Sequence, residues 1–346
     1  MSNPTIVLVT GASGFIGAHV TAQLLDAGYY VKGTARGVKL QRLQAVFGSN
    51  KRFEAVELDN IVSGDLAQAM SGVDAIVHLA SPLAGRQAPE DALNSAIEGT
   101  LNVLRHAVKA GISKIVVTSS WATTLNPSLA ATFAGVTFTE KDWGNTSRED
   151  LLTEGRTPLY VYCGTKILAE LAGWEFATQH RDLDLATINP PFVYGRPIDG
   201  LSTGGGITSL GSNALIYQLI AGEPGRPLPF QLPPYYCNVR DVARAHILAL
   251  QLPKLSAGAD VRDKRFIVAG PGVLLWADAV KVVQEERPTL RGRLPSMENA
   301  SPLPGPLSKV DTTRARDILG MKDYVDWKDT LLETIDALIE AEKSWE

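Results

Sequence analysis

The sequence is poor in the residues that build disulfide frameworks and metal sites. Only two cysteines occur among 346 residues, Cys163 and Cys237, and neither belongs to a CxxC motif. We therefore expect two free thiols rather than a disulfide framework or a thiolate metal site. The five histidines are scattered, without the HxxxH or HExxH spacing of metal-binding helices. A metal in the active site is consequently not expected.

An excess of charge of one sign and long hydrophobic runs are also missing. The 33 basic and 37 acidic side chains leave a net charge of −4. This balance gives no electrostatic attraction to nucleic acid or to an anionic membrane surface. No stretch reaches the roughly 18 apolar residues of a membrane span, and no basic segment precedes an apolar run at the N-terminus. We expect a cytoplasmic protein, a monomer or homodimer, whose partner is a small molecule.

Short β-branched runs alternate with longer helical patterns through the first 190 residues. This alternation predicts an α/β fold with a doubly wound parallel sheet of the Rossmann type. The strands are expected at 5–10, 30–35, 53–58, 75–79, 114–119 and 184–189. The helices are expected near 15–27, 39–47, 91–110 and 159–180, the last capped by Thr157 and Pro158.

After Pro190 the rhythm breaks into Gly-, Ser- and Pro-rich segments at 200–213 and 222–234. A helix at 239–250 and a strand at 265–268 are expected to rejoin the main sheet. The predicted division is therefore a nucleotide-binding Rossmann domain of residues 1–190 plus about 239–270, and a smaller non-contiguous substrate-binding domain of residues 191–238 and 271–346.

The segment "VTGASGFIG" at residues 9–17 places three glycines between the first strand and the first helix. Such a turn lets the backbone approach a pyrophosphate, and the helix N-terminus offers free N–H groups to it. An ordinary βα turn is the alternative, because a glycine triplet alone is a weak signal. We expect the cofactor to lie on this turn, at Gly11, Ser13, Gly14, Phe15, Ile16 and Gly17.

The second strand indicates which dinucleotide binds. It ends in "GTARG", which places Arg36 nineteen residues after Gly17, with no acidic residue between Gly33 and Gly37. An acid at this offset binds the ribose of NAD, whereas an arginine accommodates the additional phosphate of NADP. The pattern favours NADPH, held by Arg36 with help from Lys39. Asp59, at the end of the third strand, is a candidate partner for the adenine amino group.

Tyr162 and Lys166 are four residues apart in "YVYCGTK", so they share one face of the expected helix. A nearby ammonium lowers the pKa of a phenol and makes it a usable general acid toward a carbonyl oxygen. An indifferent surface pair is the alternative. Tyr160 lacks such a partner, because the residue four positions later is Gly164.

The strand at 114–119 ends in "VVTSSWA". Because the carboxyl ends of parallel strands surround the ligand crevice, Thr118, Ser119 and Ser120 are expected to face the cofactor. A hydroxyl there can donate to a substrate oxygen as it gains negative charge.

Together these motifs resemble the extended short-chain dehydrogenase/reductases, and within them the fungal and yeast NADPH-dependent aldehyde and ketone reductases and the dihydroflavonol reductase-like enzymes. The likeness extends along nearly the whole chain, through "VHLASP", "GTLNVLRHA", "YVYCGTKILAE", "INPPFVYG" and "VRDVARAHILAL". It implies reduction of a carbonyl compound with NADPH, catalysed by Ser120, Tyr162 and Lys166, with Ser119 as the fallback serine. It further implies cofactor contacts from Ala80, Ser81, Pro190 and Val193, and from Tyr162 and Lys166, of which Lys166 holds the nicotinamide ribose.

Two other functions are compatible with parts of this pattern. A sugar-nucleotide epimerase or dehydratase shares the fold and the three catalytic residues, but Arg36 and the lack of clustered basic residues at 191–240 argue against it. A non-catalytic NADP-sensing regulator would not need all three catalytic residues. For the reductase, we expect a hydrophobic or aromatic carbonyl substrate in a pocket formed by Leu125, Phe192, Leu201, Thr203, Tyr235 and Tyr236.

Overall fold

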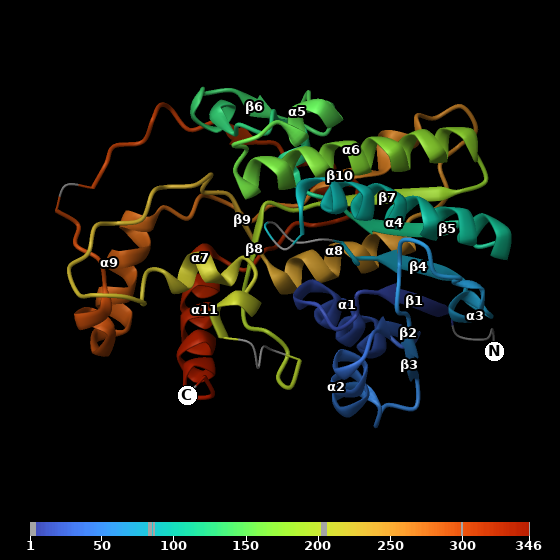
Figure 1. Ribbon diagram of the computed structural model, residues 1–346, viewed down its shortest axis with the longest axis horizontal. Helices are drawn as coiled ribbons and strands as arrows, with labels where there is room; N and C mark the ends of the chain where they lie inside the picture. The colour runs from blue at the N-terminus through green and yellow to red at the C-terminus, as the bar shows by residue number, and fades with distance from the viewer. Residues whose placement is uncertain (1–4, 82–84, 86, 202–205, 299, 346) are drawn as a thin grey trace.

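The centre of the protein is a seven-stranded sheet in which every strand runs parallel to its neighbours, in the order β10-β7-β5-β4-β1-β2-β3 (Figure 1). The computed structural model describes residues 5–81, 85, 87–201, 206–298 and 300–345. The strands of this sheet are β1 (Ile6–Thr10), β2 (Tyr30–Ala35), β3 (Phe53–Glu57), β4 (Ala75–His78), β5 (Lys114–Thr118), β7 (Asp184–Asn189) and β10 (Arg265–Ile267). The strand order reverses between β1 and β4, which is where open α/β sheets bind their ligands. The predicted doubly wound parallel sheet is confirmed.

Helices cover both faces of the sheet. On one face, α1 (Phe15–Asp26) packs against α8 (Val239–Gln251), with α2 (Val38–Phe47) beside β2 and β3. On the other face, α4 (Pro89–Ala110) packs along α6 (Pro158–Gln179), with α3 (Ala67–Met70) next to α4 and α5 (Arg148–Leu152) next to α6. As expected, Pro158 opens α6, and the Thr157 hydroxyl oxygen accepts a hydrogen bond from the N–H of Tyr160 at 3.2 Å.

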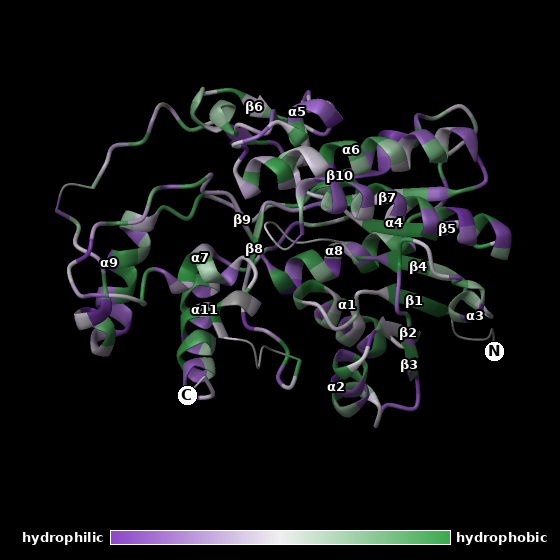
Figure 2. Cartoon of the chain, in the orientation of Figure 1, coloured by the Kyte–Doolittle hydropathy of each residue, from purple (hydrophilic) through white to green (hydrophobic). Residues whose placement is uncertain are grey.

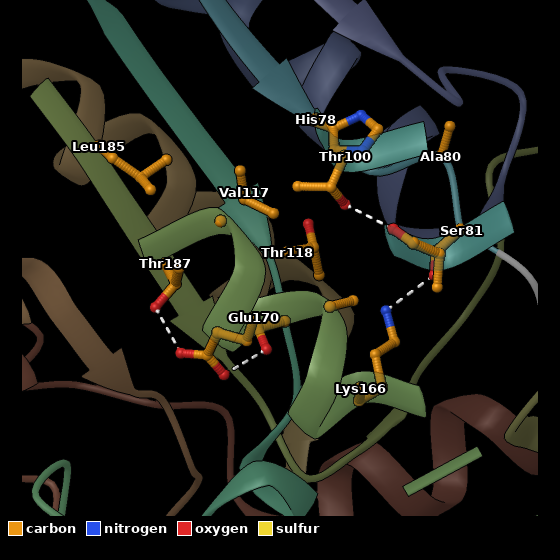
Figure 3. A pocket seen from close by; sticks show the side chains of 14 residues that line it. His78, Ala80, Ser81, Thr100, Val117, Thr118, Lys166, Glu170, Leu185 and Thr187 are labelled. Carbon is orange, nitrogen blue, oxygen red and sulfur yellow. Dashed lines mark hydrogen bonds between the residues drawn. The ribbon is translucent and has the colours of Figure 1, made fainter. Parts of the chain in front are cut away.

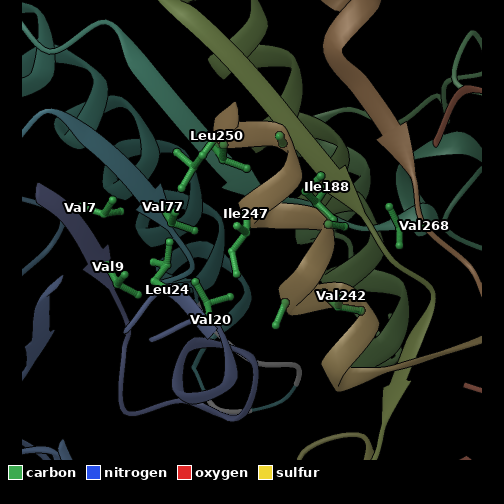
Figure 4. Close-up of a cluster of buried hydrophobic side chains, with 14 of the residues drawn as sticks. Val7, Val9, Val20, Leu24, Val77, Ile188, Val242, Ile247, Leu250 and Val268 are labelled. Carbon is green, nitrogen blue, oxygen red and sulfur yellow. The ribbon is translucent and has the colours of Figure 1, made fainter. Parts of the chain in front are cut away.

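The two-residue period of the strands divides their side chains between the two faces. Val7 and Val9 of β1 belong to the apolar cluster under α1 and α8, which Figure 4 shows in close-up. Leu8, between them, belongs to the cluster under α4 and α6. Because both faces are buried, β1 and β4 are hydrophobic along their length, whereas α4 carries both polar and apolar residues (Figure 2).

A second group of elements lies beside the sheet (Figure 1). The parallel pair β8 (Phe192–Tyr194) and β9 (Tyr236–Asn238) leads into a separate apolar cluster with α7 (Asn213–Tyr217), α9 (Trp276–Glu286) and α11 (Trp327–Glu342). A further short parallel pair joins β6 (Thr137–Phe138) to β11 (Lys309–Val310), and α10 (Thr313–Ile318) packs near β10. Short 3-10 turns occur at Trp121–Thr124, Ala130–Phe133, Gly206–Ser209, Val261–Lys264 and Pro288–Arg293. The division into two domains at residue 190 stays a proposal.

In the described part of the chain, no helix combines the length and apolar character needed to cross a membrane. Cys163 and Cys237 are both buried free thiols.

Candidate active site

The glycine turn between β1 and α1 is too crowded for side chains. Gly11 has a positive φ of 70°, and a Cβ there would come within 2.9 Å of the backbone nitrogen of Ala80. A Cβ on Gly17 would overlap the carbonyl oxygen of Gly11. The turn itself is closed by a 2.9 Å hydrogen bond from the Gly14 N–H to the Gly11 carbonyl. Glycine at these positions therefore permits the tight turn and the close packing of β1, β4 and α1 that dinucleotide-binding turns require.

The remaining predicted cofactor residues of this region lie around the turn. Phe15 and Ile16 start α1 and are half-buried, as is Ser13 in the turn. Ala80 and Ser81 follow β4, so they lie next to the turn at the reversal of the strand order.

Arg36 and Lys39 are both exposed where β2 ends and α2 begins. Asp59, two residues beyond the end of β3, is exposed as well. The sequence analysis missed Glu57 on β3, whose carboxylate accepts a hydrogen bond from the Gly37 N–H at 3.4 Å. A local sequence pattern could not reveal this contact, because Glu57 is brought next to Gly37, between β2 and α2, only by the pairing of β2 with β3.

Tyr162 and Lys166 lie one turn apart on α6, as predicted, with the Lys166 ammonium 5.8 Å from the centre of the Tyr162 ring. The ammonium donates a 2.9 Å hydrogen bond to the hydroxyl of Ser81. Ser120 comes from the end of β5, and its hydroxyl is near enough to Tyr162 to affect the pKa of the phenol. The structure therefore brings together the residues that the resemblance implied: Ser81, Ser120, Tyr162 and Lys166.

The electrostatics of Tyr162 differ from the expectation. Burial raises the pKa of Tyr162 to about 12, while its hydrogen-bonding contact with Ser120 opposes the increase. The predicted lowering of this pKa by Lys166 is not found, because the desolvation of the phenol dominates and the ammonium is turned to Ser81. Burial also lowers the pKa of Lys166 to about 8, an effect that the charge of Glu170 counteracts.

The segment Ser119–Trp121, which follows β5, is hydrogen-bonded to the neighbouring strand β7 and to the residue after it. The Ser119 N–H donates to the Ile188 carbonyl at 2.8 Å, and the Trp121 N–H donates to the Pro190 carbonyl at 2.9 Å. Pro190 therefore lies at the same edge of the sheet as Ser120, and the buried Val193 follows it on β8. The Ser120 hydroxyl accepts a 3.2 Å hydrogen bond from the Ala122 N–H and so caps a short 3-10 turn.

A small cavity of about 30 Å³, lined by both polar and apolar residues, lies next to Ser119 (Figure 3). Its lining includes Ala80, Ser81, Thr118, Ser119 and Lys166, all named in the sequence analysis. It also includes Glu170, which the sequence analysis missed. The spacing of four residues between Lys166 and Glu170 on one helix was the signal that could have found it.

The predicted substrate-pocket residues are scattered more widely. Phe192 is half-buried on β8, and Leu201 packs against the apolar cluster of α1 and α8. Thr203 lies outside the described residues. Tyr236 is fully buried and its hydroxyl lies 3.2 Å from the backbone carbonyls of Pro271 and Val325, and its contact with a substrate stays a prediction.

Leu125 and Tyr235 are buried in a cluster with Trp121. The Tyr235 ring packs edge-on against the Trp121 ring, with 4.8 Å between the ring centres. The Tyr235 hydroxyl donates to the carbonyl of Ser308 at 2.7 Å. Tyr235 also lines a second cavity, of about 470 Å³, whose lining in the described chain does not include Tyr162. Substrate contacts of Leu125, Phe192, Leu201 and Tyr235 stay predictions.

A crowded glycine turn at the strand-order reversal, next to a tyrosine, a lysine and a serine, is typical of a dinucleotide-dependent oxidoreductase. The chain belongs to the NAD dependent epimerase/dehydratase family, whose model matches residues 7–261. Its resemblance to the extended short-chain dehydrogenase/reductases is thereby confirmed.

Curated relatives and solved structures agree with this membership. A putative uncharacterized oxidoreductase of Schizosaccharomyces pombe is 38% identical and aligns with 82% of each chain. Aldehyde reductase 2 of Sporidiobolus salmonicolor is 30% identical over 98% of this chain and 96% of its own. The crystal structure of yeast methylglyoxal/isovaleraldehyde reductase Gre2 complexed with NADPH superposes with a TM-score of 0.82, at 26% identity, over 98% of this chain and 100% of that one.

Proposed function

We propose that this protein reduces an aldehyde or ketone to the corresponding alcohol with NADPH as the hydride donor. The observation that carries the proposal is the meeting of Ser120, Tyr162 and Lys166 at the edge of the sheet that also holds the glycine turn. The relatives support it, because they include a protein named an aldehyde reductase and a reductase solved with NADPH.

Bound NADPH supplies a hydride to the carbonyl carbon. The hydroxyl of Tyr162 gives its proton to the carbonyl oxygen, since burial keeps the phenol protonated at neutral pH. Ser120 donates a hydrogen bond to the same oxygen and orients the carbonyl. Lys166, one turn along α6, stabilises the phenolate that the proton transfer leaves on Tyr162.

The cofactor-binding residues form three groups. The backbone of Gly11, Gly14 and Gly17 lies against the pyrophosphate at the N-terminus of α1. Arg36 and Lys39 bind the phosphate that distinguishes NADPH from NADH. The other proposed cofactor contacts are Ser13, Phe15, Ile16, Asp59, Ala80, Ser81, Thr118, Pro190 and Val193.

The proposed substrate is a hydrophobic or aromatic carbonyl compound. Its support is the apolar character of Phe192, which is half-buried on β8 two residues after Pro190, and of the aromatic cluster around Trp121. Apolar and aromatic walls with a few polar groups are the common composition of small-molecule pockets.

The test is the consumption of NADPH by the purified protein with a panel of aliphatic and aromatic aldehydes and ketones. We expect turnover by the natural sequence and a loss of about 10²–10⁴-fold in kcat for Tyr162→Phe, because that change removes the general acid. NADPH binding, followed by fluorescence titration, should survive the substitution. Tight NADPH binding without turnover of any carbonyl compound would overturn the proposal.

A further inference from the structure

Glu170 is a buried carboxylate at which four elements of the fold meet. It lies on α6, one turn beyond Lys166, with only 1% of its side chain exposed. Five donors surround its two oxygens: Ser119 Oγ at 2.6 Å, Asn189 Nδ2 at 2.8 Å, Arg265 Nε at 2.8 Å, Trp174 Nε1 at 3.1 Å and Thr187 Oγ1 at 3.2 Å. A carboxylate with this many partners stays ionised, and the pKa of Glu170 is held below its usual value by Arg265 and these donors despite burial.

Arg265 of β10 supplies the opposite charge and is fully buried. Its guanidinium donates to the carbonyls of Glu140 and Asp142 at 2.6 and 2.8 Å and lies over the Trp143 ring at 3.6 Å. Such pairing satisfies both charges, which a buried ion pair requires. The pair therefore forms a rigid anchor under the site.

Three chains of hydrogen bonds connect the Glu170–Arg265 pair with Ser120 or its neighbour Ser119. In the first, the Glu170 carboxylate accepts a hydrogen bond from the hydroxyl of Ser119, the residue directly before Ser120. In the second, the Asn189 amide donates both to Glu170 and, at 3.3 Å, to the Ser120 carbonyl. In the third, the Thr123 hydroxyl, which accepts from Arg265 at 2.8 Å, donates to the same carbonyl at 2.8 Å.

These contacts distinguish the two serines. The Ser119 hydroxyl donates to Glu170 in the interior, whereas the Ser120 hydroxyl accepts from the Ala122 N–H and makes its hydrogen-bonding contact with Tyr162. Glu170 and Lys166 also line the same 30 Å³ cavity (Figure 3), and the negative charge of Glu170 favours the Lys166 ammonium.

We propose that Glu170 is a positioning residue of the reductase site, which holds Ser120 in its donating orientation through Ser119 and Asn189 and keeps Lys166 charged. The inference rests on the proposed function. Glu170 is buried and its oxygens are occupied by donors of the protein, so its effect is expected in the turnover step rather than in NADPH binding.

The test compares Glu170→Gln, Ser119→Ala and Ser120→Ala in NADPH-dependent turnover over a range of pH. Ser119→Ala should lower kcat by about tenfold with unchanged NADPH affinity, because small misplacements of a catalytic group are costly. Ser120→Ala should lose more. In Glu170→Gln, the decline of kcat at high pH should move to lower pH, since the charge that favours the Lys166 ammonium is gone; a purely structural role would not move it.

Trp174→Phe is the matched control. It removes a different hydrogen bond to Glu170, from an indole that is buried in the core and is not hydrogen-bonded to the Ser119–Ser120 segment. It should keep kcat within about twofold, whatever it does to the melting temperature. If Glu170→Gln does not fold, Ser119→Ala carries the test alone. An unchanged kcat in Ser119→Ala, or a larger loss in Ser119→Ala than in Ser120→Ala, overturns the inference. If the natural sequence itself turns over no carbonyl compound, it is the proposed function that fails, and the inference falls with it.

Discussion

The hydroxyl of Thr10, at the end of β1, lies 2.7 Å from Nδ1 of His78, at the end of β4. The same oxygen accepts from the backbone N–H groups of Leu79 and Ala80 at 3.2 and 3.3 Å, so its proton is directed to the imidazole. This arrangement joins the two strands at the glycine turn and requires a neutral His78. Burial, together with the Lys166 charge, lowers the pKa of His78 to about 3.

Stability is consequently expected to fall in acid. The pKa of His78 is lower in the folded state than in the unfolded chain, so the unfolded state binds one more proton between about pH 6.5 and pH 3. This residue alone makes the free energy of unfolding fall by about 1.4 kcal/mol per pH unit on acidification through that window. Urea unfolding at pH 7, 6 and 5 should show a shallower decline for His78→Gln than for the natural sequence. Equal slopes would contradict the neutral, buried histidine.

Gly17→Ala should damage both stability and cofactor binding. The added Cβ would overlap the Gly11 carbonyl and come within 3.1 Å of the Ala12 Cα, and backbone atoms cannot move aside as a side chain can. We expect a loss of about 1–3 kcal/mol in stability and weaker NADPH binding. In the control Gly99→Ala, on α4, the nearest atom is Ile61 Cγ2 at an ordinary 3.5 Å. Calorimetry and NADPH titration of the two variants should diverge; similar behaviour would argue against the crowded turn.

Arg36→Ala should change the choice of cofactor. Loss of a charged hydrogen bond to a phosphate costs about 1.5–3 kcal/mol, which corresponds to a rise of about 10–100-fold in KM for NADPH. KM for NADH should change little, because NADH lacks that phosphate. Arg105→Ala, which removes an exposed arginine paired with Glu98 on α4, is the control. Equal effects on the two cofactors would show that Arg36 does not bind the distinguishing phosphate.

Reduction should slow as the pH rises through about 8. Burial places the pKa of Lys166 near 8, so the ammonium that stabilises the Tyr162 phenolate is lost above this value. Lys166→Arg, whose side chain stays charged, should extend the plateau of kcat to higher pH at a reduced maximum. A natural enzyme whose kcat stays level up to pH 10 would contradict this role for Lys166.

The sequence by itself determined the local features of the protein. Apolar periodicity was sufficient to predict the strands of the main sheet and the helices α1, α2, α4, α6 and α8, because each element buries a face that its own residues encode. The glycine turn and the shared face of Tyr162 and Lys166 are equally local. For this reason the fold and the outline of the candidate site could be predicted without coordinates.

Only the tertiary structure decided how distant residues share the interior. Ser119 meets Glu170 across 51 positions and Glu170 meets Arg265 across 95, distances over which no periodicity carries information. The same limit applies to Tyr236, because its full burial and the contacts of its hydroxyl with Pro271 and Val325 could not be read from its neighbours in the sequence. Burial and pairing are properties of the packed chain, since they depend on which elements become neighbours in space.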